Sequence, residues 1–168
     1  RLKVGDSFQY KLSMMNFAGT AHQNLVVYDV LPRIGDRSVN NQADRGSEFT
    51  VNLRGPITPP EGYQVYYTDS QEVYQKDMAS LVDANIWRQD TAGWSQENWN
   101  QITAFKFVAN DGVEFGDAQI DFIVPVKVMD ALTPESEAKL NGKEAQDRDT
   151  GTAVYLEATN SFGYSTNS

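Results

Sequence analysis

The chain has three tryptophans, and all of them lie within thirteen residues, at Trp87, Trp94 and Trp99. Sugar-binding proteins often stack the apolar face of a pyranose ring on an exposed aromatic side chain. The segment around Trp87 and Trp94 is rich in Gln, Asp, Glu and Asn, whose side chains can hydrogen-bond hydroxyl groups. These two tryptophans, together with Tyr66 and Tyr67, are therefore the candidate ligand-binding residues. Trp94, in a predicted loop, is the first choice.

Core packing is the alternative for the same aromatic residues. Trp99 lies just before the apolar segment 102–109, which predicts a structural role for its side chain. Trp87 lies at the end of a possible short helix, where packing is again favoured over binding. Large aromatic side chains would then close one end of the fold and anchor a long connection.

Residues that could support catalysis are few. His22 is the single histidine, and it lies in a turn-like stretch without a visible partner, so we expect it to be solvated or capping. The chain has no cysteine, which removes thiolate nucleophiles, disulfides and cysteine metal sites. A Gly-rich phosphate loop and zinc-type spacing are also absent from the sequence. We therefore expect a protein that is not an enzyme.

Two acidic clusters have the composition of a possible calcium site. Asp111, Glu114 and Asp117 form the first, and residues 144–149 contain the second. Calcium takes several oxygen ligands, which loops can supply. Neither cluster matches the helix–loop–helix calcium pattern, so solvated acidic loops are the favoured interpretation. We therefore expect no cofactor, with calcium as the one alternative.

The overall charge restricts the possible partners. The chain carries 14 Lys and Arg against 23 Asp and Glu, which gives a net charge of -9. This balance repels phosphate backbones and anionic membrane surfaces, so we expect neither nucleic acid nor direct membrane contact. The absence of cysteine and of Asn-x-Ser/Thr sequons is in keeping with a bacterial exported protein. No apolar run is long enough to span a membrane.

Alternation of apolar and polar residues predicts β-strands over much of the chain. Residues 7–14, 49–53 and 120–128 all alternate with a period of two. Within the last of these, Pro125 falls on the polar face and lacks an N–H donor, which predicts an edge strand or a bulge.

Two further segments are apolar on both faces and are predicted to be central strands. They cover residues 25–31 and 102–109. Residues 152–158 are predicted to add a strand near the C-terminus. The predicted core consists of inward-facing residues of all these strands: Phe8, Tyr10, Leu12, Val27, Phe49, Val51, Phe105, Phe107, Phe122, Val124, Val126 and Leu156.

Helical signals are sparse. One short helix is predicted around Met78, Leu81 and Val82, with these three side chains turned inward. A second, of one to two turns, is predicted to begin at the cap Thr133 and to end before Gly142. Many short strands with few helices predict an all-β fold, an antiparallel β-sandwich.

Two segments near the N-terminus carry a resemblance to a known family. They read "LKVGDSFQYKLSMMN" and "QNLVVYDVLP". This pattern resembles the opening of immunoglobulin-like domains in Gram-positive cell-wall-anchored surface proteins of the adhesin and pilin type. The segments "GSEFTVNLRGPITPPEGYQVYYT", "WNQITAFKF" and "ATNSFGYS" look like later strands of such domains. The positions that match the opening phrase are Val4, Gly5, Asp6, Phe8, Tyr10, Leu12, Met14, Asn16, Asp29, Leu31 and Pro32.

The resemblance implies a fold, a location and a role. Residues 1–168 would form one immunoglobulin-like β-sandwich domain, cut from a longer multidomain protein that is extracellular and attached to the cell wall elsewhere. The role would be that of a non-enzymatic structural or adhesive module that spaces or presents a binding region, with neighbouring domains of the same chain as partners. The first alternative is an adhesin domain that binds a host or bacterial surface glycan or a host protein through residues 87–99. The second is a glycoside-active enzyme.

The resemblance also implies a possible covalent cross-link. Many relatives form a spontaneous Lys–Asn isopeptide bond that a buried carboxylate assists. Asn160 looks like the terminal Asn of such a pair, and the lysine would be Lys3 or Lys11. The alternation in residues 7–14 places Lys11 on the polar face, where it would lack the apolar pocket that keeps an amine neutral.

Overall fold

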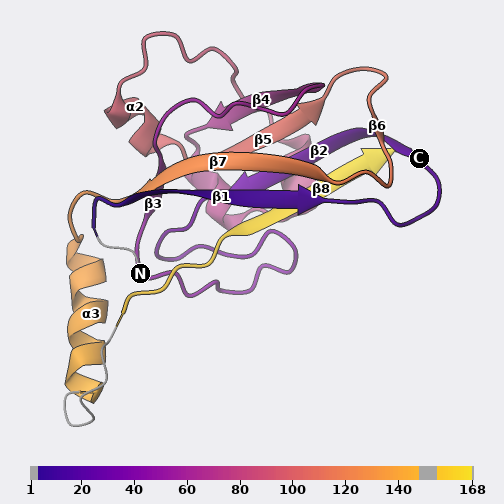
Figure 1. Ribbon diagram of the computed structural model, residues 1–168. Helices are drawn as coiled ribbons and strands as arrows, with labels where there is room; N and C mark the ends of the chain where they lie inside the picture. The colour runs from indigo at the N-terminus through magenta and orange to yellow at the C-terminus, as the bar shows by residue number, and fades with distance from the viewer. Residues whose placement is uncertain (1–3, 148–154, 168) are drawn as a thin grey trace.

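The computed structural model describes residues 4–147 and 155–167, and in this part of the chain strands outnumber helices. Figure 1 shows the strands in two layers, with α3 projecting from one end. The strands are β1 (Ser7–Met14), β2 (His22–Val30), β3 (Val51–Leu53), β4 (Tyr63–Thr68), β5 (Ala104–Ala109), β6 (Glu114–Phe115), β7 (Ile120–Val128) and β8 (Ser161–Asn167). The helices are the 3₁₀-helix η1 (Gln71–Gln75) and the α-helices α1 (Met78–Asp83), α2 (Gln96–Gln101) and α3 (Pro134–Asp147). None of these helices is long and apolar enough to cross a membrane.

The strands form two antiparallel sheets. The smaller sheet has the order β1-β7-β3. In the larger sheet, β4 pairs with β5, β5 with β2, and β8 with the opposite edge of β2. The two-residue strand β6 pairs with the first residues of β2. The predicted β-sandwich is confirmed at this level: two antiparallel sheets, few short helices and a sandwich-like arrangement.

Strand β1 has the predicted alternation. Leu12 and Met14 are buried between the sheets, whereas Lys11 and Ser13 are exposed on the outer face. Consecutive side chains of a strand point to opposite faces, so the sequence pattern fixes which residues enter the core.

Strands β2 and β5 are central, as predicted, because both faces of β2 are covered. Leu25 and Val27 belong to the core between the sheets. Val30 faces the other way and packs in a second apolar cluster with Val73 of η1 and Leu81 of α1. The run of apolar residues in β2 therefore reflects two separate cores, one on each side of the larger sheet.

Pro125 lies in the central strand of the smaller sheet, so the predicted edge strand is wrong. Its carbonyl accepts a hydrogen bond from the backbone N–H of Arg54, the residue that follows β3. In an antiparallel strand the N–H and C=O of one residue point toward the same neighbour. The missing donor thus faces the place where β3 ends, and the pairing with β1 is not interrupted.

The predicted strand over residues 152–158 is also wrong in its described part. Residues 155–158 carry no strand, and residues 152–154 lie outside the described residues. The last strand is β8, which begins directly after Asn160. The segment that precedes β8 is still held by a backbone hydrogen bond, since the N–H of Glu48 donates to the carbonyl of Glu157.

The helices differ from the prediction in detail. In α1, Leu81 is buried, but Val82 is 46% exposed and does not face inward. Helix α3 begins as predicted, because the Thr133 hydroxyl accepts a hydrogen bond from the backbone N–H of Ser136. It then continues through Gly142 to Asp147, well beyond the one to two turns expected.

Most of the predicted core is buried. Phe8, Tyr10 and Phe49 are partly buried and pack against the main core, and Leu156 is half-buried. The predicted core residues that are fully or almost fully buried are Leu12, Val27, Val51, Phe105, Phe107, Phe122, Val124 and Val126.

Candidate functional site

The four predicted ligand-binding aromatics do not form one surface. Tyr67 belongs to the core between the sheets and Trp94 packs against that core, whereas Trp87 packs against the second cluster on the outer face of the larger sheet. Tyr66 and Tyr67 are consecutive in β4, so their side chains point to opposite faces. The structure therefore divides the set into two pairs, one on each side of the larger sheet.

The inner pair packs with Trp99. The rings of Trp94 and Trp99 pack edge to face at 4.7 Å, and Trp99 packs in the same way on Tyr67 at 5.1 Å. Tyr67 is buried, and its hydroxyl accepts a hydrogen bond from the backbone N–H of Ile57. Tyr67 is thus a core residue and cannot present its ring to a ligand, and the structural role predicted for Trp99 is confirmed.

The aromatic rings that remain half-exposed already carry a cation of the protein itself. The guanidinium of Arg88 lies 4.9 Å from the ring centre of Trp94. The Lys106 ammonium lies 5.0 Å from the ring centre of Trp87 and 5.6 Å from that of Tyr66. Sugar stacking needs a free aromatic face, and these internal cation–π contacts compete for it.

The acidic residues of the predicted calcium site are not gathered around one point. Asp111, Glu114 and Asp117 are exposed. Asp111 lies in the turn that Gly112 closes, and Glu114 begins β6. Within residues 4–147 and 155–167, no three acidic or histidine side chains form a group that could hold a metal ion.

A buried carboxyl group is the most unusual chemical feature of the sandwich. Asp29, on the inner face of β2, is completely buried. One of its oxygens, Oδ2, accepts a 2.9 Å hydrogen bond from the hydroxyl of Tyr10 in β1 and a 2.7 Å hydrogen bond from the side-chain amide of Asn160, just before β8. We call Tyr10, Asp29 and Asn160 the carboxyl clasp, because they join both sheets at three separate segments of chain.

Burial perturbs the titration of this clasp. Removal of the Asp29 carboxyl from water raises its pKa from 3.8 to about 7, and the hydrogen bonds from Asn160 and Tyr10 and the charge of Arg45 only partly oppose this rise. The pKa of Tyr10 is raised well above 10 by burial and by the neighbouring Asp29. Asp29 is therefore poised to change its charge near neutral pH, whereas Tyr10 stays protonated.

The clasp also contains hydrogen-bonding capacity that is not used. Asp29 Oδ1 and Asn160 Oδ1 are both buried without a hydrogen-bond partner among the described residues. Unpaired buried polar atoms cost free energy, so each such atom needs a reason. Protonation of the Asp29 carboxyl lessens that cost, since a neutral acid is less penalised by burial than a carboxylate.

The structure distinguishes the two lysines named as isopeptide candidates. Lys11 lies on the outer face of β1, with its side chain 53% exposed and its ammonium 4.0 Å from the carboxylate of Asp121. It therefore faces away from Asn160, which lies at the clasp between the sheets. Lys3 lies outside the described residues.

A buried ion pair supports the strand end next to the clasp. Arg45 Nη2 lies 2.8 Å from Asp36 Oδ2, and both side chains are almost fully buried. Arg45 also donates hydrogen bonds to the carbonyls of Val30 and Leu31, and the Ser47 hydroxyl donates to Asp36. The loop that follows β2 is thus fastened to the strand that carries Asp29.

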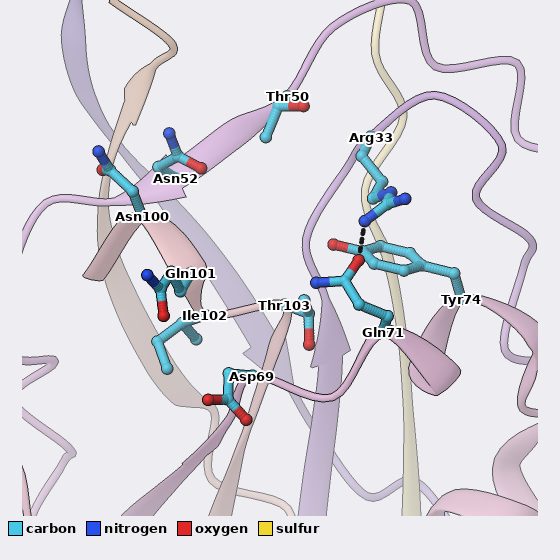
Figure 2. Close-up of a pocket in the computed structure, with 10 residues that line it drawn as sticks. All are labelled: Arg33, Thr50, Asn52, Asp69, Gln71, Tyr74, Asn100, Gln101, Ile102 and Thr103. Atoms are coloured by element: carbon cyan, nitrogen blue, oxygen red, sulfur yellow. Dashed lines mark hydrogen bonds between the residues drawn. The ribbon is translucent and has the colours of Figure 1, made fainter. Parts of the chain in front are cut away.

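A polar groove of about 380 Å³ lies beside β3, and none of the predicted site residues lines it. Figure 2 shows side-chain amides on one side and Arg33, Gln71 and Tyr74 on the other. The residues that line it are Arg33, Thr50, Asn52, Asp69, Gln71, Tyr74, Asn100, Gln101, Ile102 and Thr103.

Neither protein-family models, nor curated proteins, nor solved structures give a match to the chain.

Sequence reasoning missed Asp29 as a site residue, although a signal was present. Residues 25–31 were predicted to be apolar on both faces, and a carboxyl in such a strand must be buried. The groove had no comparable signal, because its lining comes from segments between Arg33 and Thr103 that only the fold brings together.

Proposed function

We propose that this domain is a non-enzymatic, load-bearing module of a Gram-positive cell-surface protein, with an immunoglobulin-like fold, that spaces or presents a binding region. The observation that carries the proposal is the carboxyl clasp, in which Asp29 joins the first strand to the segment that enters the last one. The resemblance of the two N-terminal segments to such surface domains supports the same role.

The direction of the first and last strands suits a module under tension. Figure 1 shows β1 and β8 running in the same direction, so that β1 begins at one end of the sandwich and β8 finishes at the other. β1 pairs with β7 along its whole length, and β8 pairs with β2. A load applied through the two ends of the chain would act along these strands, so many hydrogen bonds would have to break together.

The clasp would add resistance at a point that both strands share. Tyr10 belongs to β1, and Asn160 immediately precedes β8, so pulling either strand out of the sandwich separates a buried hydrogen bond to Asp29. Buried hydrogen bonds to a polar group are costly to break without replacement by water. The clasp thus couples two strands that lie in different sheets.

Single-molecule force spectroscopy tests this proposal. The domain would be pulled through handles at residues 1 and 168, and separately through cysteines introduced at the exposed positions Ala18 and Gln119. The second geometry peels β1 from β7 starting at the pair Met14–Ile120. We expect clearly higher unfolding forces when the load passes through the two ends.

Two results would contradict the load-bearing role. Equal, low forces in both geometries would show that the strands do not resist shear. A variant with Asn160→Ala that unfolds at the wild-type force would show that the clasp carries no load. Ser13→Ala, which removes an exposed hydrogen bond to Asp121 on the outer face of β1, is a matched control.

An isopeptide cross-link forms a second part of the proposal. A neutral lysine amine would attack Cγ of Asn160, the C–N bond to the side-chain nitrogen would break, and ammonia would leave. Asp29 is suited to assist, because its carboxyl already binds that side-chain nitrogen and its pKa is raised to about 7. Of the two candidate lysines, Lys3 is the one that such a bond would use, since Lys11 faces outward.

Intact-mass measurement of the purified domain tests this cross-link separately. A mass lower by one ammonia, restored in Lys3→Ala and in Asn160→Ala, would establish it. A mass equal to that of the chain without a cross-link would exclude the bond, while the load-bearing role would still rest on the hydrogen-bonded clasp.

A further inference from the structure

The polar groove beside β3 contains a buried side chain with unused hydrogen-bonding groups. Asn52 is only 8% exposed, and its neighbours Val51 and Leu53 are core residues. Its side-chain amide makes no hydrogen bond to any residue that the structure describes, and it lines the groove. Because this amide opens onto the groove and has no partner among the described residues, its donor and acceptor groups are available to a polar ligand.

A second side-chain amide, that of Asn100, lies on the same side of the groove and is oriented by Gln96. Gln96 in α2 donates one hydrogen bond to the carbonyl of Leu53 and another, of 2.8 Å, to Oδ1 of Asn100. The oxygen of Asn100 is therefore occupied, and its N–H₂ group remains available as a donor. Gln101, the next residue, is exposed and also lines the groove.

On the opposite side of the groove, a hydrogen bond likewise orients the side-chain amide of Gln71. The guanidinium of Arg33 donates a hydrogen bond to Oε1 of Gln71, so the Gln71 N–H₂ group is left free, and Figure 2 shows that group turned toward the groove. Asp69 accepts a hydrogen bond from Arg88 through Oδ2, which leaves Oδ1 as an acceptor. The lining thus offers unpaired donors on Asn100 and Gln71 and an unpaired acceptor on Asp69.

Arg33 adds a positive charge that has no acidic partner in the described part of the chain. Its guanidinium lies 4.3 Å from the ring centre of Tyr74, which holds the side chain in place. Arg33 forms no ion pair with any described residue. A guanidinium has five N–H donors, so several remain for a ligand, and a carboxylate is the group that matches their planar arrangement.

We propose that this groove binds an acidic saccharide, a sugar that carries a carboxylate, such as a uronic or sialic acid residue. The carboxylate would pair with Arg33, and the hydroxyls would bind the amides of Asn52, Asn100 and Gln71 and the free oxygen of Asp69. Hydroxyl groups both donate and accept, as this mixed lining requires. The volume of about 380 Å³ falls in the range of small-ligand sites, roughly 300–1,000 Å³.

This inference concerns ligand binding and goes beyond the load-bearing role. It also differs from a sugar platform on the tryptophans, because Trp87, Trp94 and Trp99 do not line the groove. A single titration can therefore distinguish the groove from a tryptophan platform, because the side-chain amides report on the first and the indole groups on the second.

Side-chain amide signals in ¹⁵N-HSQC spectra provide the test. The ¹⁵N-labelled domain would be titrated with 3′-sialyllactose and with a hyaluronan tetrasaccharide, and with lactose as the neutral sugar. We expect at least one acidic probe to shift the amide signals of Asn52, Asn100 and Gln71 saturably, with lactose binding at least tenfold more weakly. The tryptophan indole signals should move less than these amides.

Four variants make the result specific. Asn52→Leu removes no existing hydrogen bond, so we expect it to fold and to lose binding, and Gln101→Ala at an exposed position should weaken binding as well. Arg33→Gln should lower the affinity for the acidic probe at least tenfold, toward that of lactose. Gln9→Ala, an exposed amide on the outer face of β1, should bind like the wild type.

Three results would overturn the proposal. The amide signals could stay unchanged at millimolar concentrations of both acidic probes. Lactose could bind as tightly as the acidic probes, which would remove the role of Arg33. Binding could also persist in folded Asn52→Leu and Gln101→Ala variants, which would place the saccharide elsewhere.

Discussion

The side-chain amide of Asn160 donates a 2.7 Å hydrogen bond to the carboxylate of Asp29, although the two residues are 131 positions apart in the chain. The same oxygen of Asp29 accepts the hydroxyl of Tyr10, from the other sheet. The buried carboxyl of Asp29 in β2 thus links β1 to the residue that directly precedes β8. It makes the stability of the sandwich depend on the protonation of one residue.

Stability should fall as the pH rises from about 4 to 7. The pKa of Asp29 is 3.8 in its ordinary state and about 7 in the folded protein, so within this window the native state holds a proton that the unfolded chain has lost. Stability then decreases with pH, with a limiting contribution from this one group of roughly 1.4 kcal/mol per pH unit. Tyr10 and Arg45, which face Asp29, keep their charge states throughout. Urea unfolding at several pH values measures the slope.

The variant Asp29→Asn serves as the reference for this pH effect. Its amide oxygen can still accept from Tyr10 and Asn160, but the side chain does not titrate. The free energy of unfolding of the wild type, taken relative to the variant, should therefore decline between pH 4 and 7 and level off above. Parallel curves for the two proteins would mean that Asp29 titrates normally.

Truncation of Phe122 should be strongly destabilising. This side chain is 0% exposed and packs against Phe107 and Tyr63. Phe122→Ala should lower the free energy of unfolding by about 3–5 kcal/mol, through lost burial and the cavity that remains. The next residue, Ile123, is 40% exposed on the outer face, so Ile123→Ala should cost well under about 1 kcal/mol. Similar losses of stability for the two variants would contradict the assignment of Phe122 to the buried face of β7 and of Ile123 to the exposed face.

Removal of one hydroxyl from the aromatic core should also be measurable. The hydroxyl of Tyr67 is the acceptor for the buried N–H of Ile57 at 2.9 Å. Tyr67→Phe leaves that N–H without a partner, which should cost about 1–3 kcal/mol in chemical denaturation. Tyr66→Phe is the matched control, because its hydroxyl is on the exposed side of β4. A Tyr67→Phe variant as stable as Tyr66→Phe would argue against the buried hydrogen bond.

Helix α3 should be strengthened by a single methyl group. Gly142 lies in its interior, and a Cβ added there would meet no atom within 4 Å. Gly142→Ala should therefore stabilise the helix by about 0.5–1 kcal/mol, because glycine loses more backbone freedom on folding. Circular dichroism and thermal unfolding would measure the gain. Gly163→Ala is the opposing case, since its new Cβ would lie 2.5 Å from the sulfur of Met78.

Local patterns predicted the strands that carry the fold. The alternation in β1 and β7 and the doubly apolar runs of β2 and β5 are confirmed, because the period of side-chain direction in a strand is fixed by the backbone. Predictions that depended on which strands lie side by side in a sheet were less successful. Pro125 predicts an edge strand or a bulge, but its tolerance in a central strand follows from where β3 ends, which no local pattern contains.

For the candidate sites too, some features follow from local sequence patterns and others only from the arrangement of the strands. Composition and periodicity are properties of short segments, and they were enough to indicate a mainly β chain with an excess of acidic residues and few groups for catalysis. Sheet packing, in contrast, places Trp87 and Trp94 on different faces of one sheet. It also placed Asn160 against Asp29 and opened a polar groove around Asn52. Such pairings join residues far apart in the chain, and they arise from sheet order and register rather than from any local preference.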